Sequence, residues 1–149
     1  MPDVGSPFPD FSLSDQAGRM WSNADLIGKR TVIYFYPKDD TSGCTTEACE
    51  FRDAIQAGWD VQVLGVSPDS AASHAKFAKK YDLPFPLLAD TERHLAEALG
   101  LWVEKSMYGR KYFGVDRSTF LINDQGVIAQ VWRGVKPKGH AQEVMQSVS

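Results

Sequence analysis

The chain has 149 residues, of which 43% are hydrophobic and 23% are charged, and its formal net charge at pH 7 is -3. This length and balance are typical of one globular domain, which we expect to span residues 1–149. The acidic net charge and the scattered Lys and Arg residues argue against a nucleic-acid-binding protein. The N-terminal segment lacks the basic start and apolar stretch of a signal peptide, and no apolar run could span a bilayer. We therefore expect a cytoplasmic protein without a membrane partner.

The first elements along the chain are a hairpin, a strand and a helix. Turn residues at 14–18 between two short extended pieces predict an N-terminal hairpin. Residues 31–36, TVIYFY, form an apolar run without alternation, which is typical of a strand buried on both faces. Pro37 ends this strand, and apolar residues at helical spacing predict a helix from Thr45 to about Ala57.

The rest of the chain alternates strands with helices and then adds an antiparallel pair. Strands are expected at 61–66 and 85–90, helices at about 68–81, 92–99 and 138–148, and a hairpin at 118–132. Ser67 is expected to cap the second helix, with Pro68 at its first position. The segment 104–114 has two glycines among aromatic and charged residues, which suits a mobile active-site loop or an ordinary surface loop. This order indicates a three-layer α/β domain with a mixed central sheet flanked by helices.

Both cysteines, Cys44 and Cys49, lie just after the first buried strand. In a reducing compartment such a pair is more often catalytic, redox-active or metal-binding than a structural disulfide. Cys44 follows Gly43 at the expected start of a helix, where N–H groups and the helix dipole favour an anion such as a thiolate. The dipole supplies only about 0.3–1 kcal/mol, so an activated thiol also needs a cation or donor. Arg117 is the candidate.

The spacing of the two cysteines limits what they can do. In an intact helix, Cα atoms five residues apart lie about 8.6 Å from each other, whereas a disulfide needs less than about 7 Å. A bond between Cys44 and Cys49 would therefore require the start of the helix to unwind. From position alone, the two could also be small buried apolar residues. Zinc binding is disfavoured, because the cysteines and the scattered histidines lack the usual ligand spacing.

Pro37, Thr41 and Cys44 stand in the arrangement Pro-x3-Thr-x2-Cys, which resembles the active-site signature of the peroxiredoxins. The stretch YFYPKDDTSGCTTEAC is similar to the peroxiredoxin Q subfamily, also called bacterioferritin comigratory protein. The likeness covers nearly the whole chain, including PDFSL, LGVSPDS, FPLLAD and DRSTFLI. The chain departs from the pattern at Ser42, where the family often has proline. It has no cysteine near residue 80, where another branch carries its resolving thiol.

The resemblance implies a thioredoxin-like fold with an N-terminal hairpin extension, and a thiol peroxidase without metal or organic cofactor. It implies that Cys44 is the peroxidatic thiol, which attacks a hydroperoxide and becomes a sulfenic acid. Cys49 would be the resolving thiol and would form an intramolecular disulfide with it. Thioredoxin or another dithiol would reduce that disulfide, and the subfamily favours a monomer.

Four further residues are candidates for the site. The Thr41 hydroxyl would donate to the peroxide, Pro37 would close the pocket, and Arg117 would stabilise the thiolate and bind the peroxide oxygens. Glu47, three residues after Cys44, could orient the Arg117 guanidinium. Taken singly, Pro37 could be a simple strand terminator, Arg117 a solvated surface cation and Glu47 a first-turn helix acid.

Other functions compatible with two cysteines are weaker. A disulfide reductase of the thioredoxin type would have Cys-x-x-Cys, whereas this chain has Cys-x4-Cys. A non-catalytic peroxide sensor or holdase, in which helix opening exposes a surface to a partner protein, is the alternative from another class. The histidines His74, His94 and His140 are expected to be solvated and non-catalytic, because no acid partner is apparent.

Overall fold

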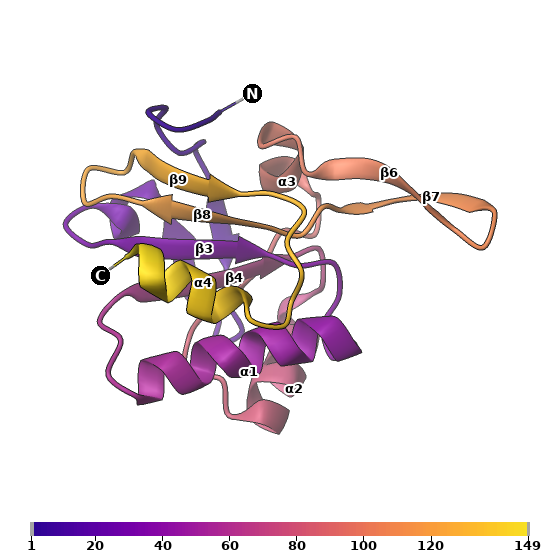
Figure 1. The fold of residues 1–149 in the computed structure, drawn as a ribbon, viewed down its shortest axis with the longest axis horizontal. Coiled ribbons are helices and arrows are strands. Elements are labelled where there is room, and N and C mark those ends of the chain that lie inside the picture. The colour runs from indigo at the N-terminus through magenta and orange to yellow at the C-terminus, as the bar shows by residue number, and fades with distance from the viewer. Residues whose placement is uncertain (1, 149) are drawn as a thin grey trace.

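A five-stranded mixed sheet forms the centre of the computed structural model, which describes residues 2–148 (Figure 1). The strands stand in the order β5-β4-β3-β8-β9. Their bounds are Thr31–Phe35 for β3, Gln62–Ser67 for β4, Leu87–Ala89 for β5, Ser118–Ile122 for β8 and Ile128–Trp132 for β9. β3, β4 and β5 are parallel to one another, whereas β8 runs antiparallel to both β3 and β9. The predicted mixed sheet is thus confirmed.

Two layers cover the sheet. The helices on one face are α1 (Ser42–Gln56), α2 (Ala71–Tyr81) and α4 (His140–Ser147). The other face is covered by the N-terminal hairpin of β1 (Ser12–Ser14) and β2 (Met20–Ser22), the 3-10 helix η1 (Asn23–Leu26) and α3 (His94–Ala98). Within residues 2–148, no helix has both the length and the apolar character needed to cross a membrane.

The central strand β3 explains why its sequence shows no alternation. Val32 and Tyr34 pack against the side that carries α1, α2 and α4. Ile33 and Phe35 pack against the side that carries α3 and the N-terminal hairpin. Every residue of β3 is buried, because both faces of the strand lie inside the domain.

The segment 104–114 is where the loop prediction is wrong. It lies within an antiparallel hairpin of β6 (Trp102–Met107) and β7 (Arg110–Val115), which projects from the body of the domain (Figure 1). Tyr108 and Gly109 form its turn, and both have positive φ, of 52° and 77°. This is the backbone that a two-residue turn of type I′ requires. The mixture of aromatic and charged residues is therefore the pattern of two strands exposed to solvent.

The start of α2 also differs from the prediction. Ser70 is its N-cap, and the Ser70 hydroxyl oxygen accepts a hydrogen bond from the Ser73 N–H at 3.2 Å. Ser67 is instead the last residue of β4, where it pairs with Ala89 of β5. Two serines could serve as caps, and the second is followed by the strong helix formers Ala71 and Ala72.

Candidate active site

Cys44 lies at the edge of the sheet where β3 ends. A loop of residues 36–41 leads from β3 to α1, and Cys44 is the third residue of that helix. The carboxyl end of a strand beside a helix N-terminus is the usual place for a ligand site in an open α/β sheet. N–H groups in the first turn have no acceptor within the helix, so they favour negative charge nearby. The Cys44 side chain is buried, with 1% of its surface exposed, so its sulfur is shielded from bulk water.

Strand pairing brings Arg117 to the same edge. Ser118, the first residue of β8, pairs with Phe35, the last residue of β3, so the residue before β8 lies near the start of α1. The Arg117 Nη2 donates to Cys44 Sγ at 3.3 Å, and Nη1 donates to Glu47 Oε1 at 2.7 Å. One guanidinium thus contacts two groups that are three residues apart on α1. A cation in contact with the sulfur favours the thiolate.

Glu47 and Arg117 form an ion pair whose two members differ in burial. Glu47 is fully buried, and this burial raises the pKa of its carboxyl from 4.5 to about 7, although Arg117 opposes the shift. Its Oε2 has no hydrogen-bond partner among residues 2–148. Burial lowers the pKa of Arg117, but Glu47 and Cys44 outweigh this effect and the net shift is upward. The site therefore holds a permanent cation beside a carboxyl that titrates near neutral pH.

The raised pKa of Glu47 gives a pH dependence of stability. Between pH 4.5 and about 7, the folded protein keeps a proton that the unfolded chain has lost. The stability that Glu47 provides is therefore full below pH 4.5 and is lost as the pH rises through about 7. We expect Glu47→Gln, which cannot ionise, to lack this decline. The free energy of unfolding of Glu47→Gln minus that of wild type should therefore increase by about 3 kcal/mol as the pH rises from 4.5 to about 7.

Urea unfolding of both proteins at the two ends of that pH range measures the difference. The exposed Glu92 provides the matched control, because Glu92→Gln removes a solvated carboxylate. A stability difference between Glu47→Gln and wild type that is the same at both pH values would contradict the raised pKa.

Thr41 and Pro37 belong to the loop that leads into α1. Thr41 is the N-cap of the helix, and its carbonyl accepts from the Thr45 N–H at 2.8 Å. The Thr41 Oγ1 donates to the Lys38 carbonyl at 2.9 Å, so its proton is engaged and its lone pairs are left as acceptors. Pro37 is half-buried directly after the last aromatic residue of the buried run. Donation from Thr41 to a peroxide would require its hydroxyl to exchange the bond to the Lys38 carbonyl, so this donation stays a prediction.

Cys49 lies further along α1 and is half-buried. Both cysteines are free thiols, and α1 runs without interruption from Ser42 to Gln56. This is the state with the helix intact, in which the spacing argument above does not allow the two sulfurs to bond.

The projecting hairpin contributes a second cation near the site. Lys105 of β6 donates from Nζ to the carbonyl of Val115, two residues before Arg117. Burial lowers the pKa of Lys105, and Arg117 lowers it further, whereas Asp116 and Cys44 raise it. The hairpin is thus electrostatically coupled to the cysteine site, which the loop prediction did not reveal.

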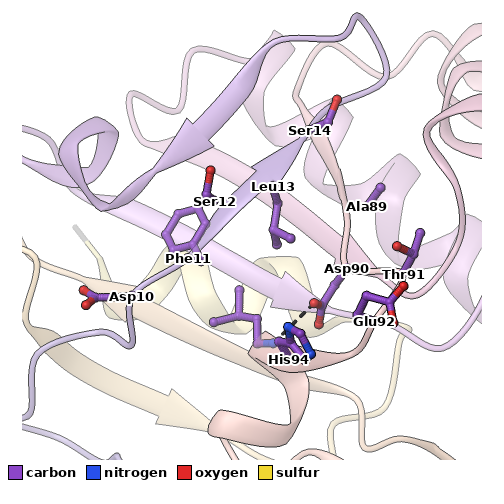
Figure 2. Close-up of a pocket in the computed structure, with 11 residues that line it drawn as sticks. Asp10, Phe11, Ser12, Leu13, Ser14, Ala89, Asp90, Thr91, Glu92 and His94 are labelled. Atoms are coloured by element: carbon purple, nitrogen blue, oxygen red, sulfur yellow. Dashed lines mark hydrogen bonds between the residues drawn. The ribbon is translucent and has the colours of Figure 1, made fainter.

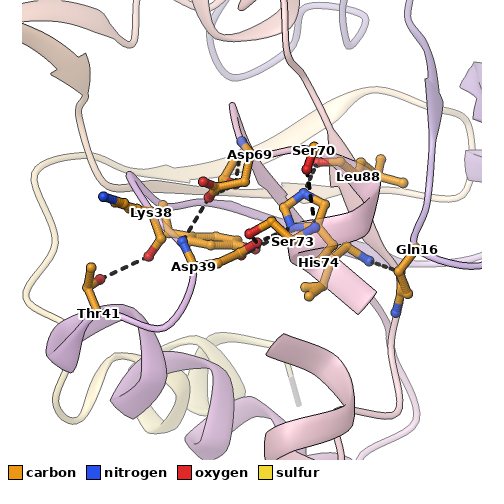
Figure 3. A network of polar contacts seen from close by, with 12 residues as sticks. Gln16, Lys38, Asp39, Thr41, Asp69, Ser70, Ser73, His74 and Leu88 are labelled. Atoms are coloured by element: carbon orange, nitrogen blue, oxygen red, sulfur yellow. Dashed lines mark hydrogen bonds and ion pairs between the residues drawn. The ribbon is translucent and has the colours of Figure 1, made fainter. Parts of the chain in front are cut away.

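Sequence reasoning missed a buried polar network beside the loop. His74 of α2 is fully buried, and its Nδ1 lies 2.7 Å from Asp39 Oδ2 (Figure 3). His140 is buried as well, between Thr119 and Glu143, and burial lowers its pKa. The expectation of solvated histidines is therefore wrong for both and holds for exposed His94. The only signal in the sequence was the Asp39-Asp40 pair directly after Lys38.

A separate cavity of about 370 Å³ lies between the N-terminal hairpin and the start of α3 (Figure 2). The Asp90 carboxylate accepts the N–H groups of Leu95 at 3.2 Å and Ala96 at 3.0 Å. Asp90 therefore serves the first turn of α3. None of the predicted site residues lines this cavity, and we place the active site at Cys44.

Known proteins resemble this chain over nearly its whole length. The sequence model of the AhpC/TSA family matches residues 4–131. Peroxiredoxin Bcp of Bacillus subtilis is 47% identical over 148 residues, covering 98% of this chain and 94% of its own.

Solved structures also resemble this chain over nearly its whole length. The bacterioferritin comigratory protein of Xanthomonas campestris, described by its alkyl peroxide reduction activity, has a TM-score of 0.89 at 38% identity, covering 98% of this chain and 97% of its own. Xylella fastidiosa PrxQ has a TM-score of 0.92 at 35% identity, with 99% and 96% covered. The predicted thioredoxin-like fold is confirmed, and the chain belongs to the AhpC/TSA family, within its Bcp/PrxQ subfamily of peroxiredoxins.

Proposed function

We propose that this protein is a thiol peroxidase that reduces hydrogen peroxide and organic hydroperoxides with Cys44 as its nucleophile. The observation that carries the proposal is the 3.3 Å contact between Arg117 Nη2 and the buried Cys44 Sγ. A shielded sulfur next to a fixed cation, at a helix N-terminus, is the environment of a reactive cysteine rather than of a structural one. The family membership supports the same chemistry.

In the first step, the Cys44 thiolate attacks the terminal oxygen of ROOH. An S–O bond forms as the O–O bond breaks, and RO⁻ leaves and takes a proton from water to become ROH. The sulfur is oxidised to a sulfenic acid, and the peroxide receives the two electrons. The Arg117 guanidinium already contacts the sulfur, so its donors can follow the negative charge onto the peroxide oxygens. To donate to the peroxide as predicted, the Thr41 hydroxyl would have to exchange its bond to the Lys38 carbonyl; while that bond holds, its oxygen can accept from the O–H of the hydroperoxide.

In the second step, Cys49 resolves the sulfenic acid. The Cys49 thiolate attacks the Cys44 sulfur, an S–S bond forms, and hydroxide leaves and is protonated to water. Because the helix must open for this bond, the first turns of α1 unwind after oxidation. Thioredoxin or another dithiol then reduces the disulfide by thiol exchange. We place the enzyme, as a monomer, in the cytoplasm, where such reductants keep thiols reduced.

Cys49→Ser separates the two steps. We expect it to consume one equivalent of peroxide per chain and then to stop, whereas the wild type turns over continuously with thioredoxin, thioredoxin reductase and NADPH. Peroxide consumption followed over time distinguishes the two. Sustained turnover of Cys49→Ser at the wild-type rate would remove Cys49 from the mechanism. A wild type that consumes no peroxide with any dithiol would refute the proposed function.

Gly43 tests how tightly the guanidinium is packed. A Cβ at this position would lie 3.0 Å from Pro137 Cγ and 3.3 Å from Arg117 Nη2, both tighter than ordinary contact. We expect Gly43→Ala to displace the guanidinium and to lower the second-order rate constant with peroxide by about 10- to 100-fold. The control is Gly114→Ala, whose Cβ would meet Lys105 at an ordinary 3.5 Å. Equal rates for the two variants would contradict the packing argument.

A further inference from the structure

The loop of residues 37–40 is held against α2 by a buried ionic network that the steps above do not use (Figure 3). The Asp39 Oδ2 lies 2.7 Å from His74 Nδ1 and accepts from the Ser73 hydroxyl at 2.8 Å. The other oxygen, Oδ1, accepts from the Tyr36 hydroxyl at 2.6 Å. The side chains of Asp39 and His74 are 4% and 0% exposed, so water does not replace these contacts.

The backbone of Asp39 is held as well. Its N–H donates to Asp69 Oδ2 at 2.8 Å, and the Ser67 hydroxyl donates to the same oxygen at 2.7 Å. Ser67 ends β4 and Asp69 lies in the connection to α2, so a second segment fixes the loop. Both the main chain and the side chain of Asp39 are thereby set in one orientation.

The surroundings of the His74 ring indicate its charge. Its Nε2 lies 3.0 Å from the Leu88 carbonyl oxygen, which only accepts hydrogen bonds, and its Nδ1 faces the Asp39 carboxylate. Next to an ionised Asp39, a neutral ring would leave one of these acceptors facing a bare nitrogen, because the Tyr36 hydroxyl 3.5 Å from Nδ1 donates its proton to Asp39. The arrangement is satisfied by an imidazolium with a proton on each nitrogen, paired with the carboxylate of Asp39. Removing one member of such a buried pair leaves the other charge without its partner.

This network lies on the path from the sheet to the reactive cysteine. Asp39 stands between Pro37 and Thr41, and Thr41 is tied back to the loop through its bond to Lys38. Because Thr41 caps α1, the loop determines where the first helical turn begins. The position of Cys44, in that turn, follows from the loop.

We propose that His74 and Asp39 are positioning residues of the peroxidase. Their ion pair holds the loop and the first turn of α1 in the arrangement that places Cys44 against Arg117. This proposal rests on the proposed peroxidase function. The outer pair between Asp40 and Lys80 joins the same loop and helix at 2.8 Å, but both side chains are exposed and the pair contributes little.

The same cluster has the composition of a metal site, since ligand atoms of Asp39, Asp69 and His74 lie within 4.8 Å of one another. However, the atoms described above already have protein partners. Both His74 nitrogens, both Asp39 oxygens and Asp69 Oδ2 make hydrogen bonds within residues 2–148. The hydrogen-bond network therefore accounts for this donor set.

The test compares His74→Gln, Asp39→Asn and the double variant with wild type. We expect each single variant to lower the second-order rate constant for oxidation of Cys44 by hydrogen peroxide by about 10- to 100-fold, in single-turnover quenched flow. The double variant should lose no more than the single ones, because both act through one contact. His94→Gln, the same change at an exposed position, and Lys80→Gln, which breaks the exposed pair with Asp40, should react like wild type.

A structural role alone would give a different result. Variants with a lowered melting temperature that remain folded at the assay temperature, and that react at the rate of His94→Gln, would overturn the proposal. If His74→Gln does not fold, Ser73→Ala still removes one donor to Asp39, and a decrease of about threefold is expected. A rate constant for Cys44 oxidation in Ser73→Ala that equals the wild-type value would then overturn the proposal.

Two further measurements address the charge and the metal. ¹⁵N NMR of the His74 ring should show protons on both nitrogens, and a neutral ring would overturn the ion pair. Wild-type activity should survive dialysis against EDTA, whereas a loss of activity that Zn²⁺ restores would indicate that the cluster binds a metal.

If wild-type Cys44 is not oxidised by peroxide at all, the proposed function fails. If wild type reacts and the variants match it, only the positioning role fails.

Discussion

Cys44→Ser should abolish peroxide reduction, lowering the second-order rate constant by about 10⁶-fold or to the detection limit, as loss of a covalent nucleophile does. A serine hydroxyl is not ionised at neutral pH, and its oxygen cannot be oxidised to a stable counterpart of the sulfenic acid. The Arg117 guanidinium can still donate to the serine oxygen, so the fold should be retained. Thermal denaturation checks this point.

The matched control for this substitution is Cys49→Ser, which makes the same chemical change five residues away on the same helix. Single-turnover peroxide consumption by the two variants gives the comparison directly. Full oxidation of Cys44→Ser by one equivalent of peroxide, at the rate of Cys49→Ser, would mean that another residue is the nucleophile.

Arg117→Lys should lower the same rate constant by about 100-fold, the usual loss when a donor to a charged transition state is removed. The guanidinium contacts Cys44 Sγ and Glu47 Oε1 with two different nitrogens. An ammonium group is a single point charge on a flexible stem and cannot keep both contacts in this geometry. Charge alone is retained, so the variant isolates the contribution of the planar, two-sided contact.

Arg110→Lys at the start of β7 is the control, because Arg110 is exposed on the projecting hairpin. Rate constants for Arg117→Lys and Arg110→Lys that agree within threefold would contradict the role of the guanidinium geometry. In that case the positive charge near the sulfur, rather than the paired donors, would carry the effect.

Much of the fold could be predicted because local sequence and tertiary structure agree. The apolar run at 31–36 has no strongly polar side chain to expose to water, which predicts a strand buried on both faces. The predicted pairing of Arg117 with Glu47 is also found, at 2.7 Å, since Arg117 directly precedes a strand that pairs with β3. The resemblance supplied the residue roles, which composition and spacing alone left open.

The remaining features depend on contacts that a single sequence does not specify. The hairpin at 102–115 packs on the core only at its base, through Trp102 and Val115, and the rest of it is largely exposed, so it lacks the hydrophobic alternation that marks a strand packed on a core. Asp39 and His74 are 35 residues apart, and only the packing of α2 against the loop brings them together. The partner of a buried histidine is therefore not visible until the helix is placed.

The most direct test of the account is the product formed on each cysteine by one equivalent of hydrogen peroxide, read by intact-protein and peptide mass spectrometry. Cys49→Ser should gain the mass of one oxygen atom on Cys44, as a sulfenic acid that a dimedone probe traps. Wild type should instead lose two hydrogens, with Cys44 and Cys49 joined in one disulfide-linked peptide. Oxygen found on another residue, with Cys44 left as a thiol, would contradict the assignment of Cys44 as the peroxide-reducing residue.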